Sequence, residues 1–363
     1  MTSAVKVAYG SSDELEASDD FLILSHQDDV ESGIRRGDVD SSRWNGRGWT
    51  MQERSLSTRL IYFCSNNIYF ECRESLASES NEPESFETFH SFQLWPRNNS
   101  SETPAEKLFQ QWRKAVVEYS HRQLTRAFDK LPAIQSIANE MMGHVPGTYI
   151  AFAGMWEDDI RSQLLWYVER GNRVRLPEYR APTWSWASLE VYIGFLIGSV
   201  GTHELEKTLL HSCPDNFQLI GFDNEYHNQP ALKNYIELKG LAKVITRIIP
   251  IDGSDYWLSM DRGSFPYNVF GESSPGNRGV LFAHGQLDLD NWDNLLSTTR
   301  QLVYFHILND QQPSGLILEK ASAELQGSTE VEIWTRVGVA TIFYGPDNSG
   351  LGEIFEEIGV III

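Results

Sequence analysis

The chain has 363 residues, enough for two or three domains, and a formal net charge of −20. This acidic balance argues against a general nucleic-acid binder and against binding to anionic membranes, because phosphate contacts need clustered Lys and Arg. With 41% hydrophobic residues and eleven Trp, the composition favours well-packed interiors over disorder. Three cysteines cannot all pair within one chain, and we interpret them as reduced thiols of a cytoplasmic protein.

Residues 1–40 are acidic and weakly patterned, with one apolar run at FLIL (Phe21–Leu24). Their opening lacks the apolar segment of a signal peptide. The longest apolar runs, Val191–Val200 and the C-terminal IGVIII, are too short to span a bilayer, so we interpret both as strands and expect no membrane partner.

The stretch RGWTMQERSLSTRLIYF (47–63) gathers three arginines around a single acid, Glu53. Trp49, Gln52, Glu53 and Leu56 recur at the i, i+3, i+4 and i+7 spacing, which predicts a helix that holds them on one apolar face. The strings RLIYFC and IYFEC follow, and the SNN between them predicts a β-hairpin.

A carboxylate on such an apolar face is partly desolvated, which raises its pKa and makes Glu53 a candidate catalytic group. The alternative is a structural salt bridge with Arg47, Arg54 or Arg59. From spacing alone the salt bridge is the favoured interpretation, because ion-pair networks also perturb carboxylates.

The polar residues 76–103 predict a loop or linker, with four aromatic anchor points at Phe86, Phe89, Phe92 and Trp95. Three helices are predicted next. The first begins near Pro104 and has an apolar stripe of Leu108, Trp112, Ala115, Val116 and Tyr119. The second has Asp129 as its N-cap and Gly143 at its end, and the third covers about residues 157–168.

From Tyr179 onward the pattern predicts strands. In APTWSWAS, strand geometry places Trp184 and Trp186 on one face, where core packing is the favoured interpretation over ligand stacking. The sequence therefore predicts an α+β protein with an N-terminal region (1–75), the polar linker (76–103), a helical region (104–178) and a β-rich C-terminal domain (179–363).

Several common catalytic and metal-binding patterns are absent from the sequence. It contains no P-loop, no G-x-G-x-x-G, no H-E-x-x-H, no paired C-x-x-C and no G-x-S-x-G. His211 and Cys213 lie close together, but two ligands do not make a zinc site. We therefore expect no metal site, and no cofactor is assigned from motifs.

Several strings together resemble one family. RGWTMQERSLSTRLIYFCSNNIYFEC resembles the closing portion of the fungal heterokaryon incompatibility (HET) domain, with its W-T-x-Q-E-R core and final E-C. The strings VEYSHRQLTRAFDKLPAIQSIANEM, YIAFAGMWEDDIRSQLLW, YRAPTWSWASLE and TRVGVA are similar to the region that follows this domain in long HET proteins. The resemblance covers about residues 43–200 and, weakly, the C-terminal end.

The family departs from this sequence at its beginning. HET domains open with an L-S-Y-x-W-G strand and later carry W-I-D and C-I-Q strings, and none of these occurs here. The resemblance thus implies a truncated HET domain, an incomplete TIR-like α/β region within residues 1–75. It leaves a sheet edge near residues 20–70, which we expect a segment of residues 1–40 or an oligomer contact to cover.

The resemblance implies a role in fungal self/non-self recognition and programmed cell death. HET domains look related to TIR domains, some of which cleave NAD with the glutamate of a W-x-x-x-E pattern. Trp49 and Glu53 fit that spacing, so Glu53 is the implied catalytic carboxylate and Trp49, Arg47 and Arg54 the implied groups around NAD as substrate. Since much of that site is not encoded, we expect action through a protein partner or homo-oligomer. The alternatives are an NAD-cleaving enzyme and a small-molecule site around the paired tryptophans.

Overall fold

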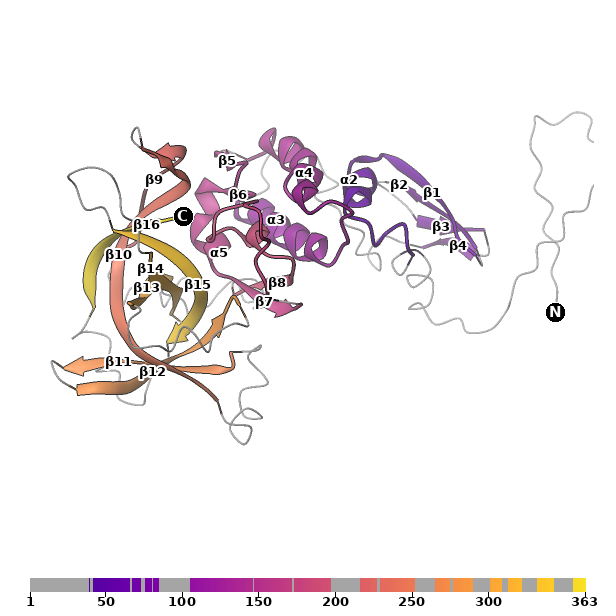
Figure 1. Cartoon of the computed structure of the whole chain (residues 1–363). Coiled ribbons are helices and arrows are strands. Elements are labelled where there is room, and N and C mark those ends of the chain that lie inside the picture. Colours follow the sequence, from indigo (N-terminus) through magenta and orange to yellow (C-terminus); the bar gives the residue numbers. More distant parts are fainter. Residues whose placement is uncertain are drawn as a thin grey trace, which may run out of the picture. The chain divides into compact units, whose positions relative to one another are not determined.

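The computed structural model describes residue 39 and residues 42–84, 105–196, 216–251, 265–289, 301–321, 332–342 and 355–363, apart from short gaps at 66, 73–75, 80, 146, 172, 227–228, 275–276 and 309–312. The chain divides into two compact units. Unit 1 comprises residues 1–103 with 122–124, and unit 2 comprises residues 104–121 with 125–363. The architecture is mixed α+β, with helices followed by a large β-rich region toward the C-terminus (Figure 1).

The described part of unit 1 is one helix and a four-stranded antiparallel sheet (Figure 1). Its elements are α2 (Gly48–Leu56), β1 (Arg59–Phe63), β2 (Ile68–Cys72), β3 (Leu76–Ser78) and β4 (Asn81–Glu84). The predicted helix and hairpin are confirmed. The prediction of an unbroken polar loop from residue 76 was wrong, because β3 and β4 extend the hairpin sheet. The four predicted aromatic anchors lie outside the described residues.

A small core holds unit 1 together on one face of the hairpin. Val39, Tyr62 and Tyr69 are buried in it, and Trp44 and Leu60 pack against them. Because side chains alternate along a strand, the neighbours of Tyr62 on β1 point to the opposite face. The hairpin therefore has one face on this core and one face turned away from it.

The helices of unit 2 follow the predicted apolar periodicity. They are α3 (Ala105–Ser120), α4 (Pro132–Met142) and α5 (Ile160–Leu164). All five residues of the predicted stripe on α3 are buried. The predicted N-cap was wrong: Asp129 ends a 3-10 turn, and Leu131 holds the cap position because Pro132 fixes the first turn of α4. Gly143 ends α4 as predicted.

The predicted third helix is shorter than expected. A 3-10 turn (Glu157–Asp159) leads into α5, and the chain then becomes β7 (Trp166–Arg170), which pairs with β8 (Tyr192–Phe195). A second small ladder joins β5 (Tyr149–Ile150) to β6 (Met155–Trp156). The strand predicted at Trp184 and Trp186 was also wrong, because this segment forms a turn and a 3-10 helix. Both side chains are nevertheless fully buried, as the core interpretation predicted.

The β-rich region is one eight-stranded sheet, and its strands are β9 (Gln218–Tyr226), β10 (Gln229–Pro250), β11 (Tyr267–Ser274), β12 (Asn277–Leu287), β13 (Leu302–Leu308), β14 (Ser314–Lys320), β15 (Ile333–Ile342) and β16 (Glu356–Ile362). The order is β11-β12-β15-β14-β13-β10, and β10 pairs again with β11. Six antiparallel strands therefore close on themselves, while β9 and β16 add to the first half of the long, curved β10 (Figure 1). The predicted final strand is confirmed as β16.

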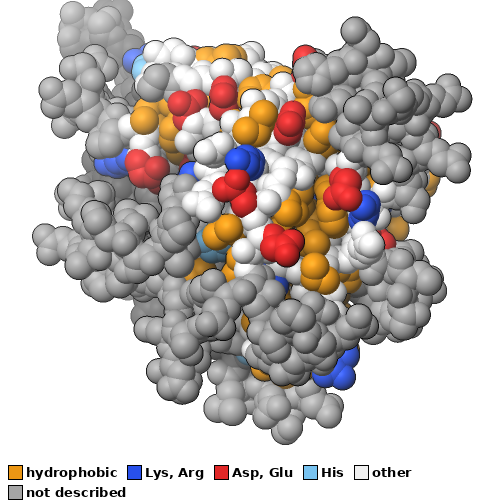
Figure 2. Space-filling model, turned by 90° about the vertical axis from the view of Figure 1, so that its left-hand side faces the viewer, with side chains coloured by type: hydrophobic (Ala, Val, Ile, Leu, Met, Phe, Trp, Pro, Cys, Tyr) orange, Lys and Arg blue, Asp and Glu red, His pale blue; other side chains and the backbone are white. Residues whose placement is uncertain are grey.

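The closed sheet encloses an apolar core, which includes Ile245, Phe282, Tyr304 and Ile317. On the described part of the face in Figure 2, acidic and basic side chains are interspersed with apolar ones. Lys239 of β10 and Glu357 of β16 form an ion pair at 2.5 Å. No helix in the described part of the chain is both long enough and apolar enough to cross a bilayer.

Gly154 shows how tightly the helical part of unit 2 is packed. Its φ is +68°, and an added Cβ would lie 2.7 Å from Leu131 Cδ2 and 3.0 Å from Trp186 Cζ2. We expect Gly154→Ala to lower the free energy of unfolding by about 2 kcal/mol, because it combines left-handed backbone strain with a core clash. Urea denaturation measures this loss. Gly359→Ala is the control, because its Cβ meets nothing within 4 Å, and an equal loss in both variants would contradict the prediction.

Candidate functional site

Helix α2 is anchored in unit 1 by its first turn. The Thr50 hydroxyl donates to the carbonyl oxygens of Trp44 (2.9 Å) and Arg47 (2.7 Å), which satisfies a polar group that is fully buried. The backbone N–H of Gly48 donates to the carbonyl of Gln123 at 2.8 Å. These contacts fix which face of α2 packs inward: the side that carries Gly48, Thr50 and Met51.

Three of the four predicted site residues, Arg47, Trp49 and Glu53, lie outside the buried side of α2. Glu53 and Arg47 are exposed, and Trp49 is 39% exposed. At 100° per residue, Trp49 and Glu53 lie nearly opposite the buried Met51. The prediction of a desolvated Glu53 was therefore wrong. The helix face that carries Trp49 and Glu53 points toward solvent, because Thr50 and Met51 occupy the core.

Arg54 is turned the other way and belongs to the sheet. Its side chain is 8% exposed, with Nε 3.4 Å from Glu71 Oε2 and the guanidinium 5.7 Å from the centroid of the Tyr62 ring. The Tyr62 hydroxyl donates to the same carboxylate at 2.5 Å, and burial chiefly raises the pKa of this phenol. The acid that Arg54 pairs with is thus Glu71 rather than Glu53. The predicted hairpin could have indicated this ion pair, because its register places Glu71 opposite Leu60 and close to Tyr62.

The hairpin face turned away from the core of unit 1 is apolar. Ile61 and Phe63 of β1 are 58% and 79% exposed, and Ile68 of β2, which is paired with Phe63, is 37% exposed. Phe70 stands opposite Ile61 and is half-buried. Such a cluster of large apolar side chains on one sheet face is typical of a surface that binds another polypeptide. Sequence reasoning identified the hairpin but did not identify this face.

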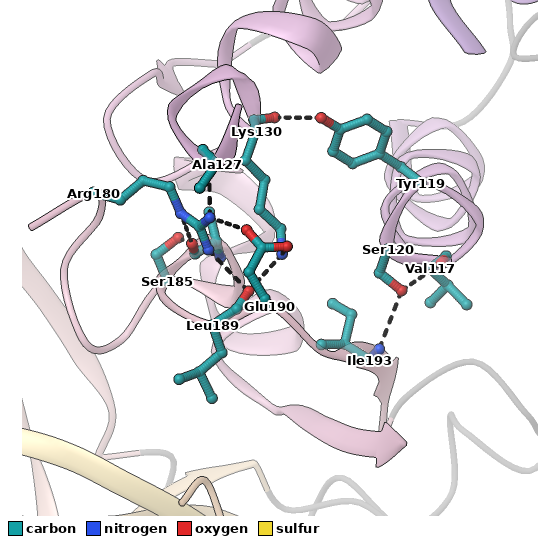
Figure 3. Close-up of polar contacts among 11 residues, drawn as sticks. Val117, Tyr119, Ser120, Ala127, Lys130, Arg180, Ser185, Leu189, Glu190 and Ile193 are labelled. Atoms are coloured by element: carbon teal, nitrogen blue, oxygen red, sulfur yellow. Dashed lines mark hydrogen bonds and ion pairs between the residues drawn. The ribbon is translucent and has the colours of Figure 1, made fainter. Parts of the chain in front are cut away.

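A second cluster, in unit 2, is built around buried cations (Figure 3). The Lys130 side chain is 4% exposed, its Nζ donates to the carbonyl of Leu189, and it lies 3.6 Å from Glu190 Oε2. Arg180 donates from Nη2 to the same Leu189 carbonyl at 3.0 Å and from Nη1 to Glu190. Two cations therefore share one carbonyl and one carboxylate.

The electrostatics of this cluster follow from its burial. Burial lowers the pKa of the Lys130 ammonium to about 8, and the neighbouring Glu190 carboxylate offsets only part of that effect. A lysine with such a pKa has the chemistry of a nucleophilic amine. Here, however, its amine is a donor to a backbone carbonyl, and its stem lies near the Trp186 ring, with Nζ 5.8 Å from the centroid. These contacts assign Lys130 a structural role that joins the 127–131 turn to residues 186–190.

The paired tryptophans also have structural partners. Trp186 Nε1 donates to the carbonyl of Gly154 at 2.9 Å, and Trp184 Nε1 donates to the carbonyl of Asn234 at 3.3 Å. Both rings are fully buried. Phe152 packs edge-to-face on Trp184 with ring centroids 5.9 Å apart. This packing supports the core interpretation over a small-molecule site around the two rings.

The resembling strings that follow residue 104 meet in unit 2. Thr183 of PTWSWAS accepts a hydrogen bond on Oγ1 from the backbone N–H of Arg336 in TRVGVA at 3.0 Å. Ser185 donates to the carbonyl of Ala153 in the YIAFAGMW string at 2.7 Å. Lys130 of the FDKLPAI string binds Leu189 of WASLE. Segments far apart in the sequence are therefore direct contact partners in one packed core.

Comparison of the chain with protein-family models, with curated proteins and with solved structures finds no match.

Proposed function

We propose that this chain is a HET-family protein of fungal self/non-self recognition that acts by binding another polypeptide rather than by cleaving NAD. The observation that carries the binding part is the exposed apolar face of the β1–β2 hairpin, with Ile61, Phe63 and Ile68 turned away from the core of unit 1. The family part is supported by the resembling strings after residue 104, because they are mutual contact partners in unit 2.

The arrangement around Glu53 supports binding over catalysis. A carboxylate that stabilises a developing positive charge needs a preorganised, water-excluding environment. Glu53 is exposed, and Arg54 is turned into an ion pair with Glu71. The alternative is a TIR-like enzyme that cleaves NAD. Its implied site consists of Glu53, Trp49, Arg47 and Arg54.

The test expresses the full chain from an inducible promoter in a filamentous fungus and counts viable cells after induction. We expect the native chain and Glu53→Gln to reduce viability equally. Ile61→Lys combined with Phe63→Lys should lose at least about ten-fold of that effect, because two charges on the apolar face prevent a partner from desolvating it. Both positions are largely exposed, so folding should tolerate the change.

A control replaces two other apolar residues that are more than half exposed, Ile220→Lys with Val244→Lys, which are 53% and 57% exposed on β9 and β10. This control should behave as the native chain does. Loss of the effect in Glu53→Gln, together with a fall in cellular NAD for the native chain alone, would favour the enzyme. No effect from the native chain would overturn the proposal.

A further inference from the structure

The outer edge of β1 offers backbone groups for a further strand. In the described part of the chain the sheet order is β1-β2-β3-β4, so β1 pairs on one side only. The N–H of Cys64 donates to the carbonyl of Asn67 at 3.0 Å, which makes this the hydrogen-bonded pair next to the turn. Since such pairs alternate in an antiparallel ladder, Tyr62 and Leu60 also bond to β2.

The residues between them consequently point their backbone groups the other way. Ile61 and Phe63 stand in non-hydrogen-bonded pairs with Phe70 and Ile68, so their N–H and C=O groups are directed to the open edge. Their side chains are also the exposed apolar ones. An unpaired edge with an apolar face is a template for another strand, and natural proteins usually cover it.

The charge near this edge selects the kind of strand that fits it. Residues 39–72 carry four arginines and three acids, a net charge of +1 in a chain whose total is −20. Arg59 is exposed at the start of β1, and Arg43 and Arg47 are exposed in the preceding segment. A strand that is apolar in its middle and acidic on both sides would match this edge in both properties.

The chain itself contains one such segment. Phe21–Leu24, FLIL, is flanked by Asp19 and Asp20 on one side and by Asp28 and Asp29 on the other, and residues 13–31 hold eight acids and no Lys or Arg. In a strand, a run of four apolar residues places two apolar side chains on each face. In either strand direction, one acidic pair comes toward the Arg59 end of β1.

The tether between this segment and the edge is long enough. Fourteen residues separate Leu24 from Val39, and an extended chain of that length reaches at most about 50 Å. Val39 is itself buried against Tyr62 of β1. The tether therefore begins at the hairpin, and the segment has a high effective concentration there.

We infer that Phe21–Leu24 pairs with the open edge of β1 as an additional strand. This inference goes beyond the proposed function, because it concerns the backbone edge of β1 rather than the apolar face that binds a partner. The pairing itself is measurable whether or not a cellular partner exists.

The test is residue-resolved amide hydrogen exchange on the full chain, in its native form and as Leu22→Asp with Ile23→Asp. We expect the amides of Ile61 and Phe63 to exchange at least about ten-fold faster in the variant, because local opening exposes them. The amides of Leu60 and Tyr62 bond to β2 and should not change, which also verifies that the hairpin remains folded. Val5→Asp with Val7→Asp is the control of equal charge and should leave all four amides unchanged.

Equal exchange of Ile61 and Phe63 in the native chain and the variant would overturn the inference. So would protection that grows with protein concentration, since a second copy would then be the occupant. Either result would leave the proposed function standing, because that proposal depends on the viability counts for the Ile61 and Phe63 variants.

Discussion

Replacing Arg336 by Met is expected to lower the free energy of unfolding by about 3–5 kcal/mol, a large share of the stability of a typical domain. Arg336 is fully buried on β15. Its Nε donates to Asp288 Oδ2 at 3.0 Å, and its Nη1 donates to the carbonyl of Leu164 at 2.6 Å. Its Nη2 donates to the carbonyl of Trp166, and the guanidinium lies 3.5 Å from the centroid of the Trp166 ring.

The loss is large because of what the substitution leaves behind. Without the guanidinium, the buried Asp288 carboxylate loses its ion-pair partner Arg336 and two carbonyl oxygens lose a donor, so each bears more of its desolvation cost. These carbonyls belong to the segment from α5 to β7, whereas Arg336 lies in the closed sheet. The side chain therefore joins the helical and β-rich parts of unit 2.

Urea denaturation of Arg336→Met, Asp288→Asn and the double variant measures this effect. The double variant should be more stable than Arg336→Met alone, since the stranded charge is gone. Lys320→Met, which removes a partly exposed ion pair with Glu332 at the far end of β14, should cost less than about 1 kcal/mol. If Arg336→Met and Lys320→Met lower the free energy of unfolding by the same amount, Arg336 does not stabilise the contact between the helical and β-rich parts of unit 2.

The sequence was most informative where a pattern is local. The α3 stripe from Leu108 to Tyr119 and the hairpin around SNN have clear periods, and both formed as predicted. On α2 the period was correct but the direction was not. Trp49 and Leu56 suggested an apolar face, yet Thr50 is buried because its hydroxyl is satisfied by two local carbonyls. Hydrophobic periodicity cannot show that a polar side chain is buried because it forms hydrogen bonds to nearby backbone carbonyls.

The closed sheet and the cation clusters depend on pairing between distant segments. Nothing in the local pattern of β10 indicates that one strand pairs with β9, β16, β13 and β11 along its length. The sequence does contain a trace of the clusters, since Lys130 and Arg336 each directly precede an apolar run, LPAI and VGVA. Their partners Leu189 and Asp288 lie 59 and 48 residues away, which is why the strings alone could not identify them.

The closed sheet also explains why the resembling strings are spread over the chain. TRVGVA lies on β15, and PTWSWAS spans a turn and the 3-10 helix that follows it. Thr183 of PTWSWAS forms hydrogen bonds with both Arg336 and Ile363. Side chains that must fit one another across such distances are constrained together by packing density. We therefore propose that packing, rather than a functional site, links the positions of these strings in unit 2.

Burial lowers the pKa of Lys130 in the folded protein to about 8, below the ordinary value of 10.5. Between these two values the unfolded chain holds a proton that the folded chain has released. The free energy of unfolding should therefore rise with pH across this window, by up to about 3 kcal/mol relative to Lys130→Met, which has no proton to release.

The measurement is urea denaturation of both proteins from pH 7 to pH 10.5, with the difference between them plotted against pH. Other titrating groups contribute to both proteins and cancel to first order. Glu190→Gln provides a second check: its carboxylate raises the pKa of Lys130, so in the Glu190→Gln background the rise should begin at a lower pH. A difference that stays constant from pH 7 to pH 10.5 would mean that Lys130 remains charged in the folded protein, held by Glu190 and the Leu189 carbonyl strongly enough to offset its burial.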